Sequence, residues 1–320
     1  MQADVHAGWA SGHNQRMAEV FVTRALPGDA LGRLRAAHAV RVWDEPLPPE
    51  PAVLREALAE TEGLLCLLTE RVDRALLDAA PRLRAIANYA VGSDNIDLEQ
   101  TEERGIAVGV TPDVLTEATA DLAFALLLAA ARGLPTAAAD AHAGDWRTWE
   151  PARWLGAEVH GATLGIVGFG RIGRAVAQRA EGFRMTVLTT AEHPLDELLE
   201  RSDFVSLHVP LTPRTRHLID AAALRRMRSS AILVNTARGG VVDQLALLEA
   251  LGAGEIAGAA LDVTDPEPPP SGDPVFSTPN LLVVPHIGSA TRAARARMTE
   301  LSVENLLAGL EGRPMPHPAR

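Results

Sequence analysis

Hydrophobic residues fall into short runs that alternate with segments of helical spacing along most of the chain. In the first third, each run is bounded by polar or turn-forming residues, as is typical of strands. The runs predict strands at residues 20–23, 40–43, 64–68, 83–88 and 106–110. The segments between them predict helices at residues 29–37, 51–60, 73–79 and 98–104. This alternation predicts a parallel sheet covered by helices on both faces.

A second alternating series begins at residue 163 and predicts a second parallel sheet. Between the two series, residues 116–132 predict a helix that is apolar nearly all round, with Thr116 as its N-cap. We expect the chain to cross between domains there and to return through a closing helix at residues 298–309. The predicted strands of the second series are residues 163–167, 185–188, 203–207, 231–235, 258–262 and 281–284.

The fold class predicted from these patterns is α/β, with two doubly wound parallel-sheet domains. The expected divisions are a loose leader at residues 1–17, one domain from residues 18–115 plus 296–320, and an inserted domain at residues 116–295.

Residues 133–160 have no regular pattern, and Gly144, Pro135 and Pro151 are expected to interrupt any helix there. Trp146, Trp149 and Trp154 lie close together in this segment. Tryptophans outside either sheet either cover a core or make contacts with another subunit. We favour the second interpretation and predict a dimerisation arm.

The composition excludes several classes of site. The net charge of -11 argues against a surface for nucleic acid or anionic membrane. Cys66 is the only cysteine, which rules out an internal disulfide and a cysteine-based zinc site, and no metal site is predicted. All 30 basic residues are arginine, so no lysine is present for Schiff-base chemistry or for a Walker-type phosphate loop.

Nothing in the hydrophobic pattern predicts a membrane protein. The longest apolar stretch, residues 122–131, is shorter than the roughly 18 residues of a membrane span. Residues 1–16 lack the basic and apolar regions of a secretory signal. We therefore expect a cytoplasmic protein.

The sequence TLGIVGFGRIG at residues 163–173 has the features of a dinucleotide-binding turn. A predicted strand precedes it and a helical pattern, residues 171–182, follows it. Gly168 suits the tight turn, Gly170 lets the backbone approach a pyrophosphate, and Gly173 lets the helix lie close to its strand. The helix N-terminus then offers N–H groups to the phosphates.

Three further segments carry polar side chains just beyond predicted strands. Arg238 follows one strand and is followed by two glycines, which suits bidentate binding of a carboxylate. Glu267 lies between prolines after the next strand, and His286 follows the last strand. Alone, each has a commoner structural role. Together, after successive strands of a nucleotide-binding domain, they indicate a catalytic site in which His286 moves a proton.

From Ala18 to Pro316 the chain resembles the D-isomer-specific 2-hydroxyacid dehydrogenase family, most closely its glyoxylate/hydroxypyruvate reductase branch. The resemblance is carried by VGSDNIDL, VTPDVLTEATADLAFALLLAAARGLP, GFGRIG, VNTARGGVVD, ALDVTDPEP and PHIGSAT. It implies a Rossmann NAD(P)-binding domain inserted in a flavodoxin-like substrate domain, with a cleft between them. It also implies a homodimer that reduces a small 2-oxo acid, glyoxylate or hydroxypyruvate.

The resemblance assigns roles to residues at matching positions. Arg238 binds the substrate carboxylate and keto oxygen, and His286 is the general acid, with Glu267 bonded to it. Val91 and Gly92 hold the carboxylate through backbone amides, and Ser289 lies beside the substrate. Trp149 reaches into the partner subunit's site. The implied cofactor-binding residues are Gly168, Phe169, Gly170, Arg171, Ile172, Gly173, Ala191, Glu192, Pro210, Thr215, Thr236, Ala237, Asp262, His286 and Gly288.

The choice between NAD and NADP depends on the end of the second strand of this domain. Ala191 stands where NAD-preferring relatives carry aspartate, and no arginine is present for a 2′-phosphate. The connection from Thr190 to Asp203 is shorter than is usual in the family. Glu192 repels a 2′-phosphate, so NAD is expected, although His193 partly offsets that repulsion.

Other interpretations of the same fold stay open. The substrate of a related dehydrogenase would be phenylpyruvate, phosphite or 3-phosphoglycerate, although the regulatory domain common in phosphoglycerate dehydrogenases is not expected here. The same fold also serves as a dinucleotide-sensing corepressor that binds partners without catalysis.

Overall fold

The computed structural model describes residues 17–319, so residues 1–16 of the predicted leader lie outside the described residues. The chain forms two compact units. The first contains the described residues up to Tyr89, Asn95–Val110 and the chain from Thr299 onward. The second contains Ala90–Asp94 and Thr111–Met298.

The first unit is a five-stranded parallel sheet of order β2-β1-β3-β4-β5, the flavodoxin-like order. Every strand predicted for it is present with slightly shifted ends. Its strands are β1 (Glu19–Val22), β2 (Ala39–Val42), β3 (Gly63–Cys66), β4 (Ala85–Asn88) and β5 (Ala107–Gly109), and its short helices are α1 (Leu31–Ala37), α2 (Pro51–Leu58), α3 (Arg74–Asp78) and α4 (Leu98–Glu103).

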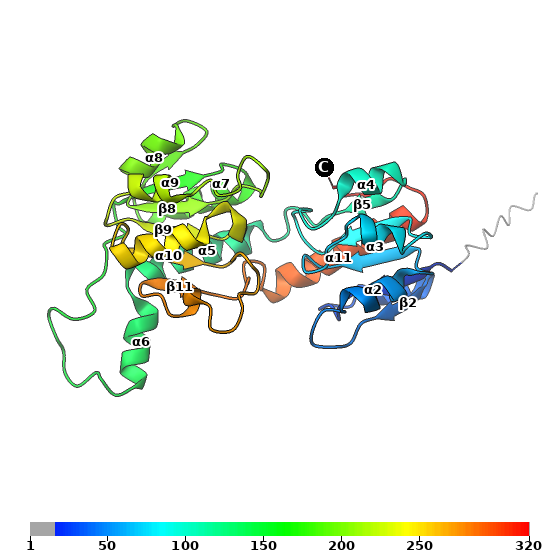
Figure 1. The fold of residues 1–320 in the computed structure, drawn as a ribbon, viewed down its shortest axis with the longest axis horizontal. Coiled ribbons are helices and arrows are strands. Elements are labelled where there is room, and N and C mark those ends of the chain that lie inside the picture. Colours follow the sequence, from blue (N-terminus) through cyan, green and yellow to red (C-terminus); the bar gives the residue numbers. More distant parts are fainter. Residues whose placement is uncertain (1–16, 320) are drawn as a thin grey trace, which may run out of the picture. The chain divides into compact units, whose positions relative to one another are not determined.

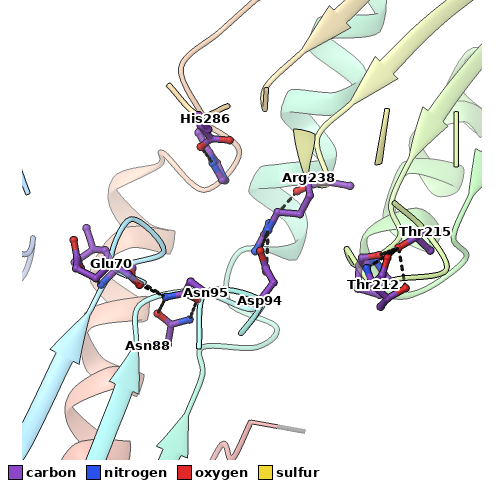
Figure 2. A network of polar contacts seen from close by, with 12 residues as sticks. Glu70, Asn88, Asp94, Asn95, Thr212, Thr215, Arg238 and His286 are labelled. Carbon is purple, nitrogen blue, oxygen red and sulfur yellow. Dashed lines mark hydrogen bonds and ion pairs between the residues drawn. The ribbon is translucent and has the colours of Figure 1, made fainter. Parts of the chain in front are cut away.

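A buried polar network lies near the carboxyl ends of β3 and β4 (Figure 2). Glu70 is 3% exposed and accepts hydrogen bonds from Thr23 Oγ1 at 2.5 Å, the Leu67 N–H at 2.7 Å and Thr69 Oγ1 at 2.6 Å. Asn95 Nδ2 donates to the carbonyl oxygen of Glu70 at 3.0 Å. A buried carboxylate is tolerated when several donors satisfy it.

Replacing this acceptor tests how far the network supports the first unit. Glu70→Ala leaves the hydroxyl of Thr23, which is fully buried, and the N–H of Leu67 without that acceptor. We expect the free energy of unfolding to fall by about 3 kcal/mol, measured by urea denaturation. The control is Glu60→Ala, which removes an exposed ion pair with Arg82 and is expected to cost less than about 1 kcal/mol. Equal stability of the two variants would contradict this account.

The second unit is a six-stranded parallel sheet of order β11-β10-β9-β8-β6-β7. The predicted fold class, two parallel sheets with helices, is therefore confirmed. The strands are β6 (Thr163–Val167), β7 (Thr186–Thr189), β8 (Phe204–Leu207), β9 (Ile232–Asn235), β10 (Gly258–Leu261) and β11 (Leu281–Val283).

Strand β7 forms one edge of this sheet. In the classic dinucleotide-binding order, a further strand follows beyond the second one. Here the short connection after β7 forms helix α8 (Leu195–Arg201) and then enters β8, which pairs with β6 on the other side. The short connection seen in the sequence thus corresponds to the missing third strand at this edge, although the sheet still has six strands.

Helices cover both faces of the second sheet (Figure 1). One hydrophobic core contains buried residues of α8, α9 (Ala221–Arg226) and α10 (Gln244–Ala253). The other contains residues of α5 (Thr116–Ala131) and α7 (Arg171–Gly182). The last helix, α11 (Arg292–Leu310), begins earlier than predicted and is divided between the units at Met298.

Helix α5 differs from the prediction at its start. The N-cap is Leu115, which makes no side-chain hydrogen bond, and Thr116 is the first helical residue. No single helix within residues 17–319 is long and apolar enough to cross a membrane. Only α5 taken together with α6 (Leu134–His142), a pair bent by 63°, passes that test, and much of α5 is buried in the core.

Helix α6 lies within the segment that the sequence predicted to be interrupted, so the expected interruption at Pro135 was wrong, whereas the helix ends just before Gly144. Pro135 occupies the first turn, where the missing N–H costs nothing, and Gly133 supplies a left-handed residue before the helix. Figure 1 shows α6 and the segment that follows it extending away from the six-stranded sheet.

Candidate active site

The turn after β6 has the geometry that the glycine pattern predicted. Gly168 has a φ of +95°, and a Cβ there would lie 2.6 Å from the carbonyl oxygen of His208. A Cβ at Gly173 would overlap the carbonyl oxygen of Gly168, so α7 lies directly against the turn. Gly170 has open space around it and precedes α7. The turn therefore fits a pyrophosphate close to its backbone.

Two neighbouring side chains support the ends of this turn. The Gly168 N–H donates to Thr190 Oγ1 at 3.0 Å, which ties the turn to the end of β7. The guanidinium of Arg174 lies over the ring of Phe169, 4.6 Å from its centroid.

Ala191 and Glu192, the residues expected to face the adenosine ribose, are exposed just beyond β7. His193 was expected to offset part of the charge of Glu192. Its Nδ1 lies 3.3 Å from a carboxylate oxygen of Glu197, so a second carboxylate shares this histidine.

The loop after β8 is closed by its own threonines. Thr215 Oγ1 donates to the carbonyl oxygen of Pro210 at 2.6 Å and accepts from the Thr212 N–H at 2.8 Å (Figure 2). After β9, Thr236 Oγ1 is buried and has no hydrogen-bond partner among the described residues. An unsatisfied buried hydroxyl at this edge fits a polar ligand group.

Arg238 follows β9, and a buried asparagine shapes the loop that carries it. Asn235 Nδ2 donates to the Arg238 carbonyl oxygen at 2.9 Å, and Asn235 Oδ1 accepts from the Ala237 N–H at 3.0 Å. A Cβ at Gly239 would overlap the backbone of Thr264, so the loops after β9 and β10 are packed together. Sequence reasoning assigned no role to Asn235, although it lies in the same segment as Arg238.

The guanidinium of Arg238 is bonded on two sides. Nε donates to both carboxylate oxygens of Asp94, at 3.1 and 3.2 Å, and Nη1 donates to the Ala237 carbonyl oxygen at 2.9 Å (Figure 2). Gly92 lies against the same group, because a Cβ there would be 2.5 Å from Nη2. The structure thus brings Arg238 together with the segment that carries Val91 and Gly92.

His286 and Glu267 form a direct pair beyond β11 and β10. His286 Nδ1 lies 2.5 Å from Glu267 Oε1, and both side chains are partly buried. When the Nδ1 hydrogen is donated to this carboxylate, Nε2 is the nitrogen left to exchange a proton with another molecule. His286 has a φ of +51°, an unfavourable conformation for a residue other than glycine, which is typical of functional sites.

Asp262 holds the backbone next to His286 in place. The Asp262 residue is 2% exposed. Its carboxylate accepts hydrogen bonds from the Ile287 N–H at 2.6 Å and the Gly288 N–H at 2.8 Å. Burial raises the pKa of Asp262 above its ordinary value, while the two N–H donors oppose that shift. Ser289, in the same loop, accepts from Arg295 Nε at 3.0 Å.

The catalytic residues expected from the sequence therefore follow three adjacent parallel strands, β9, β10 and β11. The carboxyl ends of parallel strands meet at one edge of the sheet, where ligands bind in such folds. Trp149 is not part of this group. It is 81% exposed and lies in the segment after α6, which extends away from the sheet in Figure 1.

His208, just beyond β8, makes stability depend on pH. Burial lowers the pKa of His208 to about 4, and its Nε2 lies 2.9 Å from Ser206 Oγ. Between the ordinary pKa of about 6.5 and about 4, the unfolded chain binds a proton that the folded one does not. Stability from this group is therefore complete above pH 6.5 and is lost as the pH falls toward 4.

We expect His208→Gln to remove this part of the pH dependence. Between pH 6.5 and 4.5, the free energy of unfolding of the wild type should fall by roughly 2–3 kcal/mol more than that of the variant. Urea denaturation at both pH values measures the difference. The control is His142→Gln, at an exposed histidine, for which we expect the wild-type dependence. Parallel pH profiles of wild type and His208→Gln would contradict the prediction.

Comparisons with known proteins agree on one family. Residues 124–288 match the model of the D-isomer specific 2-hydroxyacid dehydrogenase, NAD binding domain. The chain is 48% identical over 313 residues to a glyoxylate reductase of Korarchaeum cryptofilum, covering 93% of this chain and 94% of that protein. It is 46% identical over 317 residues to a glyoxylate reductase of Thermococcus litoralis, covering 93% and 96% of the two chains.

Solved structures show the same likeness. The TT0316 protein from Thermus thermophilus superposes with a TM-score of 0.88 at 49% identity, covering 94% of this chain and all of that one. An NADPH-dependent glyoxylate/hydroxypyruvate reductase from Sinorhizobium meliloti, solved with NADP and malonate, gives a TM-score of 0.83 at 32% identity, covering 94% and 96% of the two chains.

Proposed function

The chain belongs to the D-isomer-specific 2-hydroxyacid dehydrogenase family, and from this premise we propose that it reduces a small 2-oxo acid to the 2-hydroxy acid. The proposed substrates are glyoxylate and hydroxypyruvate, the substrates that give its relatives their names. The observation that carries the proposal is the grouping of Arg238 and the His286–Glu267 pair beyond adjacent strands of a nucleotide-binding sheet.

Each residue of the proposed site has a separate task. Arg238 binds the planar carboxylate and keto oxygen and opposes the negative charge that grows on that oxygen. The backbone amides of Val91 and Gly92 hold the carboxylate beside it. His286 Nε2 delivers a proton to the same oxygen, and Glu267 stabilises the protonated ring through Nδ1.

The remaining residues hold the dinucleotide. The glycine turn and the start of α7 would hold the phosphates of the dinucleotide, and Pro210, Thr215, Thr236 and Ala237, in the loops after β8 and β9, would hold its nicotinamide half. When bound, the reduced nicotinamide supplies the hydride for the carbonyl carbon. Asp262 and Gly288 place the neighbouring backbone.

We further propose that NADH is preferred to NADPH. Glu192 is exposed at the position that faces the ribose, and its charge repels a 2′-phosphate.

We also propose that Ser289 lies beside the bound 2-oxo acid.

One assay tests the proposed function. Purified protein is mixed with NADH or NADPH and with glyoxylate, hydroxypyruvate or phenylpyruvate, and the loss of reduced nicotinamide is followed by absorbance. We expect turnover of glyoxylate and hydroxypyruvate, faster with NADH. Turnover of phenylpyruvate alone would favour a related dehydrogenase. Binding of NADH without oxidation by any of the three acids would favour the non-catalytic binding protein.

We also propose that the chain forms a homodimer through α6 and the segment after it. Exposed hydrophobic side chains gather there: Leu134 at 54%, Trp146 at 67%, Trp149 at 81% and Leu155 at 78% exposure. Such a cluster is typical of an interface, because large aromatic side chains gain most when a partner covers them. In the dimer, Trp149 would reach the partner's active site.

Replacing both exposed tryptophans tests the arm. We expect the wild type to sediment at twice the chain mass of 34.0 kDa and Trp146→Ala/Trp149→Ala to shift toward the monomer. The matched control is Phe276→Ala, an aromatic that is 59% exposed outside the arm and should leave the mass unchanged. A wild type that sediments as a monomer would contradict the proposed dimer.

A further inference from the structure

We propose that Asp94 is a positioning residue for the substrate-binding guanidinium of Arg238. The proposal rests on the function proposed above, and it concerns a residue to which the sequence analysis gave no role. Asp94 would set the rotation of the guanidinium, so that the donors left for the substrate point to one place.

Asp94 and Ala237 bind one edge of the Arg238 guanidinium. Both carboxylate oxygens of Asp94 accept from Nε of Arg238, at 3.1 and 3.2 Å. Nη1 uses one hydrogen on the Ala237 carbonyl oxygen, at 2.9 Å. These bonds hold the inner edge of the planar fork, so the terminal Nη1 and Nη2 edge is the one presented to a carboxylate.

The backbone at Gly92 packs closely against the Arg238–Asp94 pair. A Cβ at Gly92 would lie 2.5 Å from Arg238 Nη2 and 2.8 Å from Asp94 Oδ1. The guanidinium, the carboxylate and the Gly92 backbone are therefore in close packing, as Figure 2 shows for Asp94 and Arg238. The rotation of the guanidinium that Asp94 selects is also the one that places Nη2 against the segment of Val91 and Gly92.

The residue that follows Asp94 is also held by hydrogen bonds. The next residue, Asn95, donates from Nδ2 to the Leu67 carbonyl oxygen at 3.1 Å and accepts at Oδ1 from Asn88 Nδ2 at 2.9 Å. These bonds hold the side chain of Asn95 within the first unit. Within the second unit, the two bonds from Asp94 to Nε restrict a long arginine side chain that otherwise has much rotational freedom.

Charge alone would give Asp94 the opposite effect. An aspartate beside Arg238 reduces the positive charge that attracts an anionic substrate, so removing it would tighten substrate binding. The two interpretations predict opposite changes in the KM for glyoxylate. The side chains of Arg238 and Asp94 are 24% and 35% exposed, which weakens the charge effect through solvent screening. We therefore expect orientation to dominate.

The experiment compares Asp94→Ala and Asp94→Asn in the full-length protein, with glyoxylate as the varied substrate and NADH as the cofactor. We expect Asp94→Ala to raise the KM for glyoxylate about tenfold or more, with the Kd for NADH unchanged. Asp94→Asn keeps an oxygen acceptor for Nε and should restore the KM to within about threefold of the wild type. The control is Glu200→Ala, which removes a surface partner of Arg226 and should change neither constant.

A double-mutant cycle separates positioning from a general structural effect. Lysine lacks Nε–H, so in an Arg238→Lys background the Asp94→Ala change should alter the KM for glyoxylate less than twofold. Equal effects of Asp94→Ala in both backgrounds, a lowered KM in Asp94→Ala, or equal losses in Asp94→Ala and Asp94→Asn would each overturn the proposal. A wild type that reduces no 2-oxo acid would instead overturn the proposed function.

Discussion

His286→Gln is expected to lower kcat for glyoxylate reduction by about 10²–10⁴-fold, with the Kd for NADH within about threefold of the wild type. Glutamine is close in size and can keep a hydrogen bond to Glu267, but it has no proton to give at neutral pH. The loss therefore measures proton delivery rather than the shape of the loop. Steady-state rates with glyoxylate and fluorescence titration of NADH measure the two constants.

The matched control is His217→Gln. His217 has the same left-handed backbone, with φ of +51° as in His286, and its Nδ1 lies 4.0 Å from the carboxylate of Asp243. We expect its kcat to stay within about twofold of the wild type. The role of His286 as general acid would be wrong if His286→Gln left kcat/KM within a few fold of the wild type.

Arg238→Lys is expected to lower kcat/KM for glyoxylate by about 10²–10³-fold. Lysine keeps the positive charge but loses the planar fork that meets a carboxylate and the keto oxygen together. It also loses the Nε–H that binds Asp94. Because the charge is kept, a large loss would show that donor geometry matters beyond simple attraction.

The control for Arg238 is Arg226→Lys, at a surface arginine whose guanidinium pairs with Asp196 at 3.2 Å and Glu200 at 3.1 Å. We expect no change in kcat/KM. If Arg238→Lys kept wild-type kcat/KM, Arg238 would not be the carboxylate-binding residue.

Much of the fold was predictable because parallel sheets have a strong hydrophobic signal. The central strands β3, β4, β8, β9 and β10 are buried on both faces, so they stand out as short apolar runs, and every predicted strand is present. The glycine turn was predictable as well, since Gly168 and Gly173 are required by backbone contacts that only the smallest residue allows. The sheet order follows from contacts distant in sequence and was not available from local patterns.

Other features were missed for physical reasons. Helix α6 was missed because Pro135 was expected to interrupt it, although proline is tolerated in a first turn. Asp94 was missed because its partner, Arg238, is distant in the sequence and the pair forms only when the loops fold. Asn235 was missed because an asparagine bonding its own loop leaves no periodic pattern.

The most direct test of the account is the product formed from hydroxypyruvate. Wild-type protein is incubated with NADH and hydroxypyruvate, and the glycerate formed is quantified and resolved into its enantiomers by chiral chromatography. The account predicts D-glycerate alone, in an amount equal to the NADH oxidised, and almost none with His286→Gln. Oxidation of NADH without glycerate, or a mixture of both enantiomers, would contradict it.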